Sequence, residues 1–449
     1  MKFSINIFKT ALIAFGFMLL NGCADELDSI RPRNQIAQDQ LSETDLGKAV
    51  NGVYASMENF IKAFYLDGDV KGENFKAGPS YALVDPVMMT ASSSDILSLW
   101  QSGFFSLNQV NFLIETYETS ANKESSTVKT AGGAGYYFRA LIYYYMAIRW
   151  GGVPVLRKRT TEIVPISPEA EVWNFIMEDL EKAEALLPEF SNKYYLSQSA
   201  CHALFAKTYL STGNSAKATE YADKVIAKSS FVLATSSVEY AMSFVYSNQS
   251  EEIVFALANN RTSNTLVIYD MVNDVDNSWS YAPASDCYSN LYADQPEKSG
   301  DIRAQAVFGQ DELRLIKFPN GQSGQFITTA SPNRSPLVVT RIAEMYLIKA
   351  EAQKNTPQGK QTLNDFMTKR YVSVNLPQTL TDREFQDIIL DERHREFYGE
   401  GFRWYDLKRT NRLDLFKTLD GRNYLMYFPV PQNERDLAGH DNYPQNTGY

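Results

Sequence analysis

The chain has 449 residues, 44% of them hydrophobic, which is enough for one large domain or two smaller ones. Acidic residues outnumber basic ones, 53 to 43, and no long basic run is present, so nucleic acid is not an expected partner. Aromatic residues make up 13% of the chain. Their flat faces can bind sugars or peptides as well as fill a core, so aromatic content alone does not separate these uses.

The first 23 residues have the pattern of an export signal. Two lysines precede an apolar run at residues 11–20, which is too short for an ordinary transmembrane helix and fits a secretory signal peptide. The run ends in Leu-Asn-Gly-Cys23, which resembles the bacterial lipoprotein signal, although Asn21 departs from its commoner residues. We expect residues 1–22 to be the signal peptide and Cys23 to carry a lipid that anchors the chain to a membrane. The alternative is a plain signal peptide with an incidental cysteine.

Residues 23–40 read as a polar tether. The acidic cluster Ala24-Asp-Glu-Leu-Asp28 resembles the surface-export signal of lipoproteins in Bacteroidota, and a solvated linker is the alternative. The chain has two further cysteines, Cys201 and Cys287. An oxidising compartment permits a disulfide between them, but we expect two free thiols.

Helical periodicity dominates from residue 41 onward. Expected helices cover residues 41–61, 98–116, 125–150 and 168–187, and a helix hairpin covers 197–228 with a break at Gly213-Asn214. Small and aromatic residues in this hairpin have a spacing that resembles a tetratricopeptide repeat, at Ala206, Tyr209, Ala218 and Ala222. Helices 125–150 and 168–187 form a similar pair, and so do helices 335–354 and 359–371. The repetition predicts a short solenoid of degenerate repeats.

The composition and the periodicity of the sequence change between about residues 230 and 335. Ser, Asn, Asp and Gly become frequent, the helical period fades, and short strand-like runs occur at Glu252–Ala256 and Thr265–Tyr269. Long irregular segments on a rigid scaffold are where binding residues concentrate. We therefore predict a mainly α fold in a single domain, residues 41–449. In it, tetratricopeptide-like helix pairs form a scaffold that carries a loop-rich insert with short strands.

The most highly charged segment is Asp391–Thr410, which reads DERHREFYGEGFRWYDLKRT and holds five carboxylates. On a helix over residues 383–400, Glu392 and Glu396 fall within the apolar stripe that begins at Phe385. Carboxylates in such a position must be paired, because an unpaired buried charge is costly. Candidate partners are the nearby Arg393, Arg395, Arg403 and Arg409, and the more distant Arg341 and Arg370.

Two carboxylates can also serve a glycosidase, in which they flank an open cleft. Because Glu392 and Glu396 share a helix face with bulky apolar residues, we favour a buried ion-pair network over a catalytic pair. His394 points away from this face, and the other histidines are His202 and His440, so neither a histidine-rich metal site nor a catalytic triad is supported. We therefore expect no catalytic residues and no metal site.

Four parts of the chain have further motif-like sequence: Arg139–Tyr144 continuing to Pro154, Arg341 with Ala343–Glu351, Glu392–Arg409, and Phe428–Glu434 with Gln445–Tyr449. Together they resemble the SusD/RagB family, the surface lipoproteins that pair with TonB-dependent outer-membrane transporters. In that family these positions are architectural and carry no catalysis. We accordingly assign a structural ion-pair network to Arg341, Glu344, Glu392, Arg393, Glu396, Arg403, Asp406 and Arg409. Gly401 is expected to end the helix.

The resemblance implies a cell-surface protein of a Bacteroidota-type outer membrane. It would bind oligosaccharide, or peptide, and deliver it as a lid to a SusC-like TonB-dependent transporter. No cofactor is implied, although some relatives bind calcium. Two alternatives stay open at this stage: a surface glycoside hydrolase, and a repeat scaffold that binds only proteins.

The candidate ligand contacts are aromatic and polar residues in irregular sequence. They are Trp279, Tyr281 and Tyr288, with Asp276 and Asn277 beside them, and Tyr81 in an earlier loop. Packing beneath the loop is the alternative role for these aromatic residues. Trp100 could line the same cleft, but its apolar neighbours at helical spacing indicate that its helix lies mainly in the core.

Overall fold

Packed helices make up most of the chain, of which the computed structural model describes residues 43–77, 89–245, 250–259, 281–308, 315–318 and 335–449. The mainly helical fold expected from the sequence is confirmed. The longer helices are α3 (Glu43–Lys71), α4 (Ser94–Thr119), α5 (Ser126–Trp150), α6 (Glu169–Leu186), α7 (Gln198–Ser211), α8 (Ser215–Ile226), α13 (Ile342–Gln353), α14 (Pro357–Arg370) and α15 (Asp382–Glu396). The shorter ones are α9 (Ser237–Met242), α11 (Ser285–Asn290), α12 (Ala304–Val307), α16 (Arg403–Arg409), α17 (Gln432–Ala438) and the 3-10 turns η3 (Leu413–Leu415) and η4 (Asn423–Met426).

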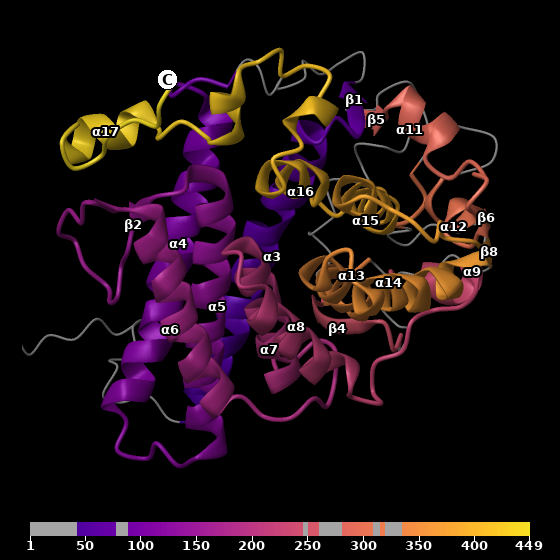
Figure 1. Ribbon diagram of the computed structural model, residues 1–449. Coiled ribbons are helices and arrows are strands. Elements are labelled where there is room, and N and C mark those ends of the chain that lie inside the picture. The colour runs from indigo at the N-terminus through magenta and orange to yellow at the C-terminus, as the bar shows by residue number, and fades with distance from the viewer. Residues whose placement is uncertain (1–42, 78–88, 246–249, 260–280, 309–314, 319–334) are drawn as a thin grey trace, which may run out of the picture. The chain divides into compact units, whose positions relative to one another are not determined.

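The long helices pack in a row that follows the chain. Helix α5 packs against both α4 and α6, α6 against α7, α7 against α8, α8 against α13, and α13 against α14 (Figure 1). The expected hairpin break falls between α7 and α8, where the Asn214 side chain caps α8 by accepting a hydrogen bond from the Lys217 amide. A row of neighbouring helix pairs is the arrangement that the repeated pattern predicted.

The short strands tie the insert to this row. All four sheets that the described residues form have two antiparallel strands. They pair β1 (Phe75–Ala77) with β5 (Tyr281–Pro283), β2 (Val153–Pro154) with β3 (Ile166–Ser167), β4 (Ile253–Leu257) with β7 (Leu337–Arg341), and β6 (Lys298–Asp301) with β8 (Tyr371–Val374). Three of these pairs join a strand of the insert to a strand outside it, so the insert is fastened to the scaffold at several places.

Three helix boundaries differ from the prediction, and the first is the end of α3, which lies at Lys71 and not at residue 61. Residues 337–341 form β7, so the helix expected over 335–354 begins at Ile342. The run Leu-Val-Val-Thr-Arg is rich in β-branched residues and is buried throughout, which favours a strand. Helix α15 ends at Glu396 and not at Gly401, because a turn with two left-handed glycines follows it. The second strand-like run, Thr265–Tyr269, lies outside the described residues.

The turn after α15 approaches α3 at the level of the backbone. Its glycines, Gly399 and Gly401, have φ values of +82° and +81°, which side chains rarely adopt. A Cβ atom on Gly68 of α3 would lie 2.1 Å from the carbonyl oxygen of Gly401, and one on Gly72 would lie 2.8 Å from Cβ of Arg403. Gly68 in the last turn of α3 and Gly72 just after the helix therefore form the surface on which the charged segment docks.

The described residues from Ala49 to Tyr449 form one compact unit. The expected signal peptide at residues 1–22, the tether at 23–40 and the lipidation site Cys23 all lie outside the described residues. In the part of the chain that the structure describes, no helix has the length and apolar character needed to cross a membrane.

Candidate ligand-binding site and the buried charge network

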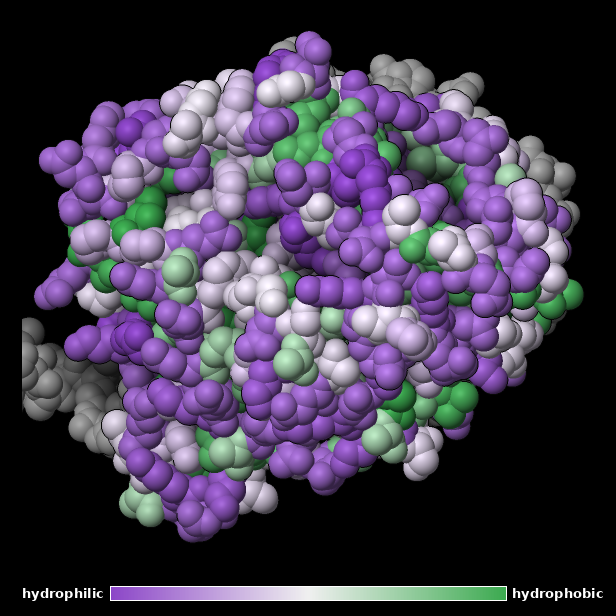
Figure 2. Space-filling view, viewed as in Figure 1, coloured by the Kyte–Doolittle hydropathy of each residue, from purple (hydrophilic) through white to green (hydrophobic). Residues whose placement is uncertain are grey.

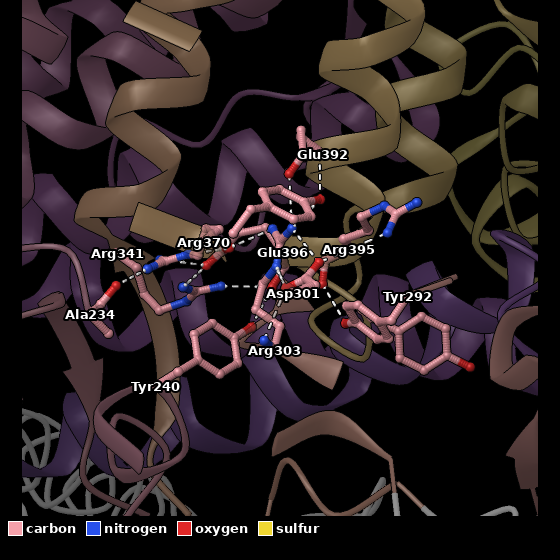
Figure 3. A network of polar contacts seen from close by, with 12 residues as sticks. Ala234, Tyr240, Tyr292, Asp301, Arg303, Arg341, Arg370, Glu392, Arg395 and Glu396 are labelled. Carbon is pink, nitrogen blue, oxygen red and sulfur yellow. Dashed lines mark hydrogen bonds and ion pairs between the residues drawn. The ribbon is translucent and has the colours of Figure 1, made fainter. Parts of the chain in front are cut away.

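Glu396 of α15 is the centre of a buried charge network (Figure 3). Its carboxylate accepts hydrogen bonds from Arg341 Nη1 at 2.5 Å, from Arg303 Nη1 at 3.0 Å and from Arg370 Nε at 2.9 Å. Glu396, Arg303 and Arg370 are 0% exposed and Arg341 is 1% exposed. Burial alone would raise the pKa of Glu396, but the guanidinium groups of Arg370, Arg341 and Arg303 hold that pKa well below its ordinary value.

Glu392 lies one turn earlier on α15 and is also fully buried. It accepts from Lys298 Nζ at 2.7 Å, from Arg303 Nη2 at 2.9 Å and from the hydroxyl of Tyr371 at 2.6 Å. Burial raises its pKa, but Arg303 and Lys298 outweigh this and leave the pKa of Glu392 lowered. Arg303 is thus shared by both glutamates, and it also binds both oxygens of Asp301 at 2.8 Å.

The network continues from α15 into the insert and the turn that follows. Arg341 also donates to Glu252 at 3.1 Å and to Glu400 at 2.7 Å. Glu252 takes a further bond from Arg370 at 2.6 Å, and Glu400 takes one from Lys317 at 2.6 Å. These charges come from segments far apart in the sequence, so the network joins α13, α14 and α15 to the insert.

The partners of the two glutamates differ from those expected nearby in the sequence. Arg393 pairs instead with Asp406 at 2.8 Å, and Arg409 pairs with Asp406 and with Glu351 of α13. Residues one position from Glu392 or Glu396 on a helix are rotated by about 100°, so their side chains leave α15 in another direction. Arg303 and Lys298, which do pair with the glutamates, lie in the insert and were not anticipated.

Two further residues of the predicted network, Glu344 and Arg403, make contacts with other partners than Glu392 and Glu396. Glu344 of α13 is 2% exposed and lies 3.2 Å from the Lys207 ammonium on α7. Burial raises the pKa of Glu344 despite this lysine. Arg403 donates to the carbonyl oxygen of Leu390 at 3.4 Å and packs against Gly72.

The network has the features of an internal support. Glu392 and Glu396 are 0% exposed and paired with fixed cations, whereas a glycosidase requires both acids to face a substrate cleft. His394 is half-buried, and its Nε2 lies 2.6 Å from the side-chain oxygen of Asn74. Within the described residues, no cluster of three or more His, Cys, Asp or Glu side chains is arranged to hold a metal ion.

A hollow of about 360 Å³ lies between α3 and α4. Its apolar lining includes Leu66 and Val70 of α3, Ile96 and Leu99 of α4, and Tyr281 of β5. These residues meet because each helix places an apolar face toward the other, with spacings of three or four residues. The volume is within the range of small-molecule sites, about 300–1,000 Å³.

Polar groups at this hollow come from the same two helices. Asp67 of α3 and Asp95, Ser98 and Ser102 of α4 line it. Asp67 is held by Arg149, whose Nε lies 3.0 Å from one carboxylate oxygen. Burial raises the pKa of Asp67, and the guanidinium of Arg149 opposes that effect. Asp95 is exposed in the first turn of α4, where the helix dipole favours a carboxylate.

Of the expected ligand contacts, the structure brings Tyr281 to the hollow. Tyr281 is 6% exposed, so it forms part of the wall and not an open platform. Tyr288 is half-buried, and its ring packs edge-on against Phe308 with the centroids 5.6 Å apart. The other candidates, Tyr81, Asp276, Asn277 and Trp279, lie outside the described residues.

The remaining aromatic and thiol predictions concern core positions. Trp100 is 1% exposed and packs against Trp150, as expected for a core residue. Cys201 and Cys287 are both buried free thiols, which confirms the expectation that they do not pair. Sequence reasoning did not single out Asp67, Asp95 or Ser98. The serine cluster before Asp95 was the available signal, because such residues mark the start of a helix.

Two family models match this chain. The model described as "Starch-binding associating with outer membrane" matches residues 27–210, which include both helices of the hollow. The model described as "SusD family" matches residues 297–423, which include the core of the charge network. The chain belongs to the SusD/RagB family.

Alignments with SusD-like proteins cover nearly the whole chain. SusD-like protein P38 of Formosa agariphila is 24% identical over 478 residues, covering 92% of this chain and 93% of that protein. The starch-binding protein SusD of Bacteroides thetaiotaomicron is 24% identical over 560 residues, covering 100% and 99%. A crystal structure of a SusD superfamily protein from Bacteroides vulgatus superposes with a TM-score of 0.76 at 24% identity, covering 91% and 99%. The SusD-like fold expected from the sequence is thereby confirmed.

Membership of the SusD family decides the broad class of function. The chain is a SusD-type glycan-binding protein associated with the outer membrane of a Bacteroides-type bacterium. It belongs with non-catalytic binding proteins, so the glycoside hydrolase alternative is set aside.

Proposed function

We propose that the hollow between α3 and α4 is where this SusD-family protein captures an oligosaccharide. The observation that carries the proposal is where two residues that line the hollow lie in the sequence. Its lining residue Met89 directly follows residues 78–88, which contain Tyr81, and Tyr281 directly follows residues 260–280, which contain Trp279. The aromatic candidates of both segments are therefore joined by sequence to the rim of one hollow.

The lining has the chemistry that a sugar needs. The C–H face of a sugar ring packs on apolar and aromatic surface, which Leu66, Ile96 and Tyr281 supply. Its hydroxyl groups donate to carboxylates and exchange hydrogen bonds with serine hydroxyls, which Asp95 and Ser98 supply. Few polar groups on a mainly apolar wall are typical of small-molecule sites. A peptide with small polar side chains is the alternative ligand.

We further propose that the protein delivers this ligand to a SusC-like TonB-dependent transporter and acts as its lid. The family resemblance supports this role, and so does the rigid row of helices, which offers a firm surface for a partner. A lipid at Cys23 would hold the protein at the membrane beside that transporter. A scaffold that binds only proteins would instead show no affinity for saccharide or peptide.

The ligand site is tested by calorimetric titration of the chain lacking residues 1–23. That deletion leaves intact the compact unit that begins at Ala49. The probes are maltoheptaose, laminarihexaose and a neutral peptide of eight residues. We expect one saccharide to bind and Asp95→Asn to weaken it about tenfold or more, the effect of losing one charged hydrogen bond. Trp279→Ala should also weaken it.

The matched control is Asp382→Asn. Asp382 is, like Asp95 on α4, an exposed aspartate in the first turn of a long helix, here α15. It should leave the affinity unchanged. Equal affinities for wild type and both aspartate variants would contradict the assignment of the hollow. Binding of the peptide alone would replace the sugar with a peptide ligand.

A further inference from the structure

Asn74 lies where three parts of the molecule meet. It follows α3, precedes β1 and is 1% exposed. Its side-chain Nδ2 lies 2.6 Å from Asp69 Oδ1 on α3, and its Oδ1 lies 2.6 Å from His394 Nε2 on α15. Its backbone carbonyl accepts from the Tyr398 hydroxyl at 2.6 Å and from the Ala284 amide at 2.8 Å. One residue thus contacts α3, α15 and the end of β5.

The direction of each hydrogen bond at Asn74 follows from its neighbours. Above its pKa of about 7, Asp69 is a carboxylate that accepts from the amides of Gly401 at 2.6 Å and Gly399 at 3.3 Å, so it is an acceptor toward Asn74 as well. Nδ2 must therefore donate to Asp69, and Oδ1 must accept from His394. Burial and the charges of Arg403 and Arg395 lower the pKa of His394 well below its ordinary value, so the imidazole is neutral and carries its proton on Nε2.

Asn74 lies next to the strand pair that carries Tyr281, one wall of the hollow. Strand β1 begins at the next residue and pairs with β5, with Ala77 opposite Tyr281. The ring of Phe75 packs edge-on against Tyr398 with centroids 5.8 Å apart. Within the residues that the structure describes, β1 and β5 form a sheet of two short strands, and such a pair is marginal in water without further support. Its position depends on the groups that fasten it to α15.

We infer that Asn74 is a positioning residue that fixes the β1–β5 pair, and with it the Tyr281 wall, on the charged segment of α15. The link runs from His394 and Tyr398 through Asn74 to Ala284 and Tyr281. The consequence for ligand affinity rests on the function proposed above. The fastening itself does not, because it is a property of the unliganded protein.

The two buried thiols report on this fastening. Cys287 lies beside the link, with Sγ 3.9 Å from Asn74 Oδ1, and Cys201 is buried on α7 within the helix row. The experiment measures the rates at which iodoacetamide labels both thiols in the chain lacking residues 1–23. Mass spectrometry of the peptides gives each rate separately. Local loosening of β1–β5 exposes Cys287 alone, whereas global unfolding exposes both thiols.

We expect Asn74→Ala to raise the labelling rate of Cys287 about tenfold or more with Cys201 unchanged, since one lost buried hydrogen bond corresponds to a factor of this size. The control is Asn111→Ala. Asn111 is also a buried asparagine, 1% exposed and bonded to Arg139 and to the carbonyl of Leu156, but it lies within the helix row. Its loss should leave the ratio of the two rates unchanged. A Cys287 rate that stays constant, or that rises only in parallel with Cys201, would overturn the inference.

A second pair of variants keeps the test decisive if Asn74→Ala fails to fold. His394→Leu removes the donor to Asn74, and His394→Gln keeps an N–H donor. We expect faster labelling of Cys287 in the leucine variant and rescue in the glutamine variant. Equal rates in both would also overturn the inference. Maltoheptaose affinity is measured in parallel: loss of affinity only in the loosened variants links Asn74 to the site. If wild type binds no saccharide, the proposed function fails while the labelling result stands.

Discussion

Replacement of Glu396 by alanine should lower the free energy of unfolding by about 3–5 kcal/mol, the usual cost of removing one partner from a buried ion pair. The structure accounts for this magnitude. The carboxylate accepts from three guanidinium groups, all of them at most 1% exposed. Each arginine keeps another carboxylate: Asp301 for Arg303, and Glu252 for both Arg341 and Arg370. These remaining pairs keep the loss within the range for one stranded partner.

The assay is urea unfolding followed by circular dichroism and tryptophan fluorescence, since urea leaves ion pairs unscreened. Glu396→Gln serves as a companion, because it keeps the volume and an acceptor while removing the charge. The control is Glu220→Ala on α8, which breaks an exposed pair with Lys217 and should leave stability nearly unchanged. A loss below about 1 kcal/mol for Glu396→Ala would refute the reasoning that this carboxylate is a buried structural charge.

The pH dependence gives an independent check on the same residue. Because Arg370, Arg341 and Arg303 hold the folded pKa of Glu396 well below its ordinary value, folding favours the ionised form. The stabilisation is therefore present above the unfolded carboxyl pKa of about 4.3 and is lost as pH falls through the folded pKa. The stability difference between wild type and Glu396→Gln should shrink in acid. A difference that grows in acid would contradict the assigned sign.

Two further predictions concern α3. Burial raises the pKa of Asp69 from 3.8 to about 7, against the hydrogen bonds from Asn74, Gly401 and Gly399. Between pH 4 and 7 the folded state therefore keeps a proton that the unfolded chain releases. As a result, the contribution of Asp69 to the free energy of unfolding falls by about 4 kcal/mol as pH rises from 4 to 7. Urea titrations of Asp69→Asn should lack this component of the slope, and parallel curves would disprove it. Gly68→Ala should cost more than about 3 kcal/mol, because its Cβ would meet the Gly401 carbonyl oxygen at 2.1 Å. Gly52→Ala on the same helix meets no atom within 4 Å and should stabilise by up to about 1 kcal/mol, so equal effects at both glycines would count against the close packing.

The sequence predicted the helical row well because helix pairing is a local pattern. Apolar spacing and stop signals located α5, α6, α7 and α8 to within a few residues, since those signals lie inside each helix. The phase of α15 likewise indicated that Glu392 and Glu396 lie on an apolar face. Both are buried in the structure.

What the sequence did not reveal depends on contacts between distant segments. Arg303 and Lys298 lie in irregular sequence about 90 positions before the glutamates that they bind, and no period marks them. Residues 337–341 were predicted as the start of a helix but form β7, which pairs with β4. The sequence could not show this, because strand pairing depends on a partner elsewhere in the chain. The hollow combines α3 and α4 with Tyr281 from about 180 positions later, so periodicity within one segment could not assemble it.

The strand pairs that fasten the insert have a consequence for how new specificities arise in this lineage. The pair of β4 with β7 brackets most of the irregular insert and holds the ends of the intervening chain, residues 258–336, at a fixed separation. The entropic cost of closing a segment between fixed ends grows only with the logarithm of its length, by about 0.6 kcal/mol for each doubling. Insertions and replacements between the strands are therefore inexpensive for the fold. Evolution can therefore exchange segments of the insert for others of different length while the helices stay the same.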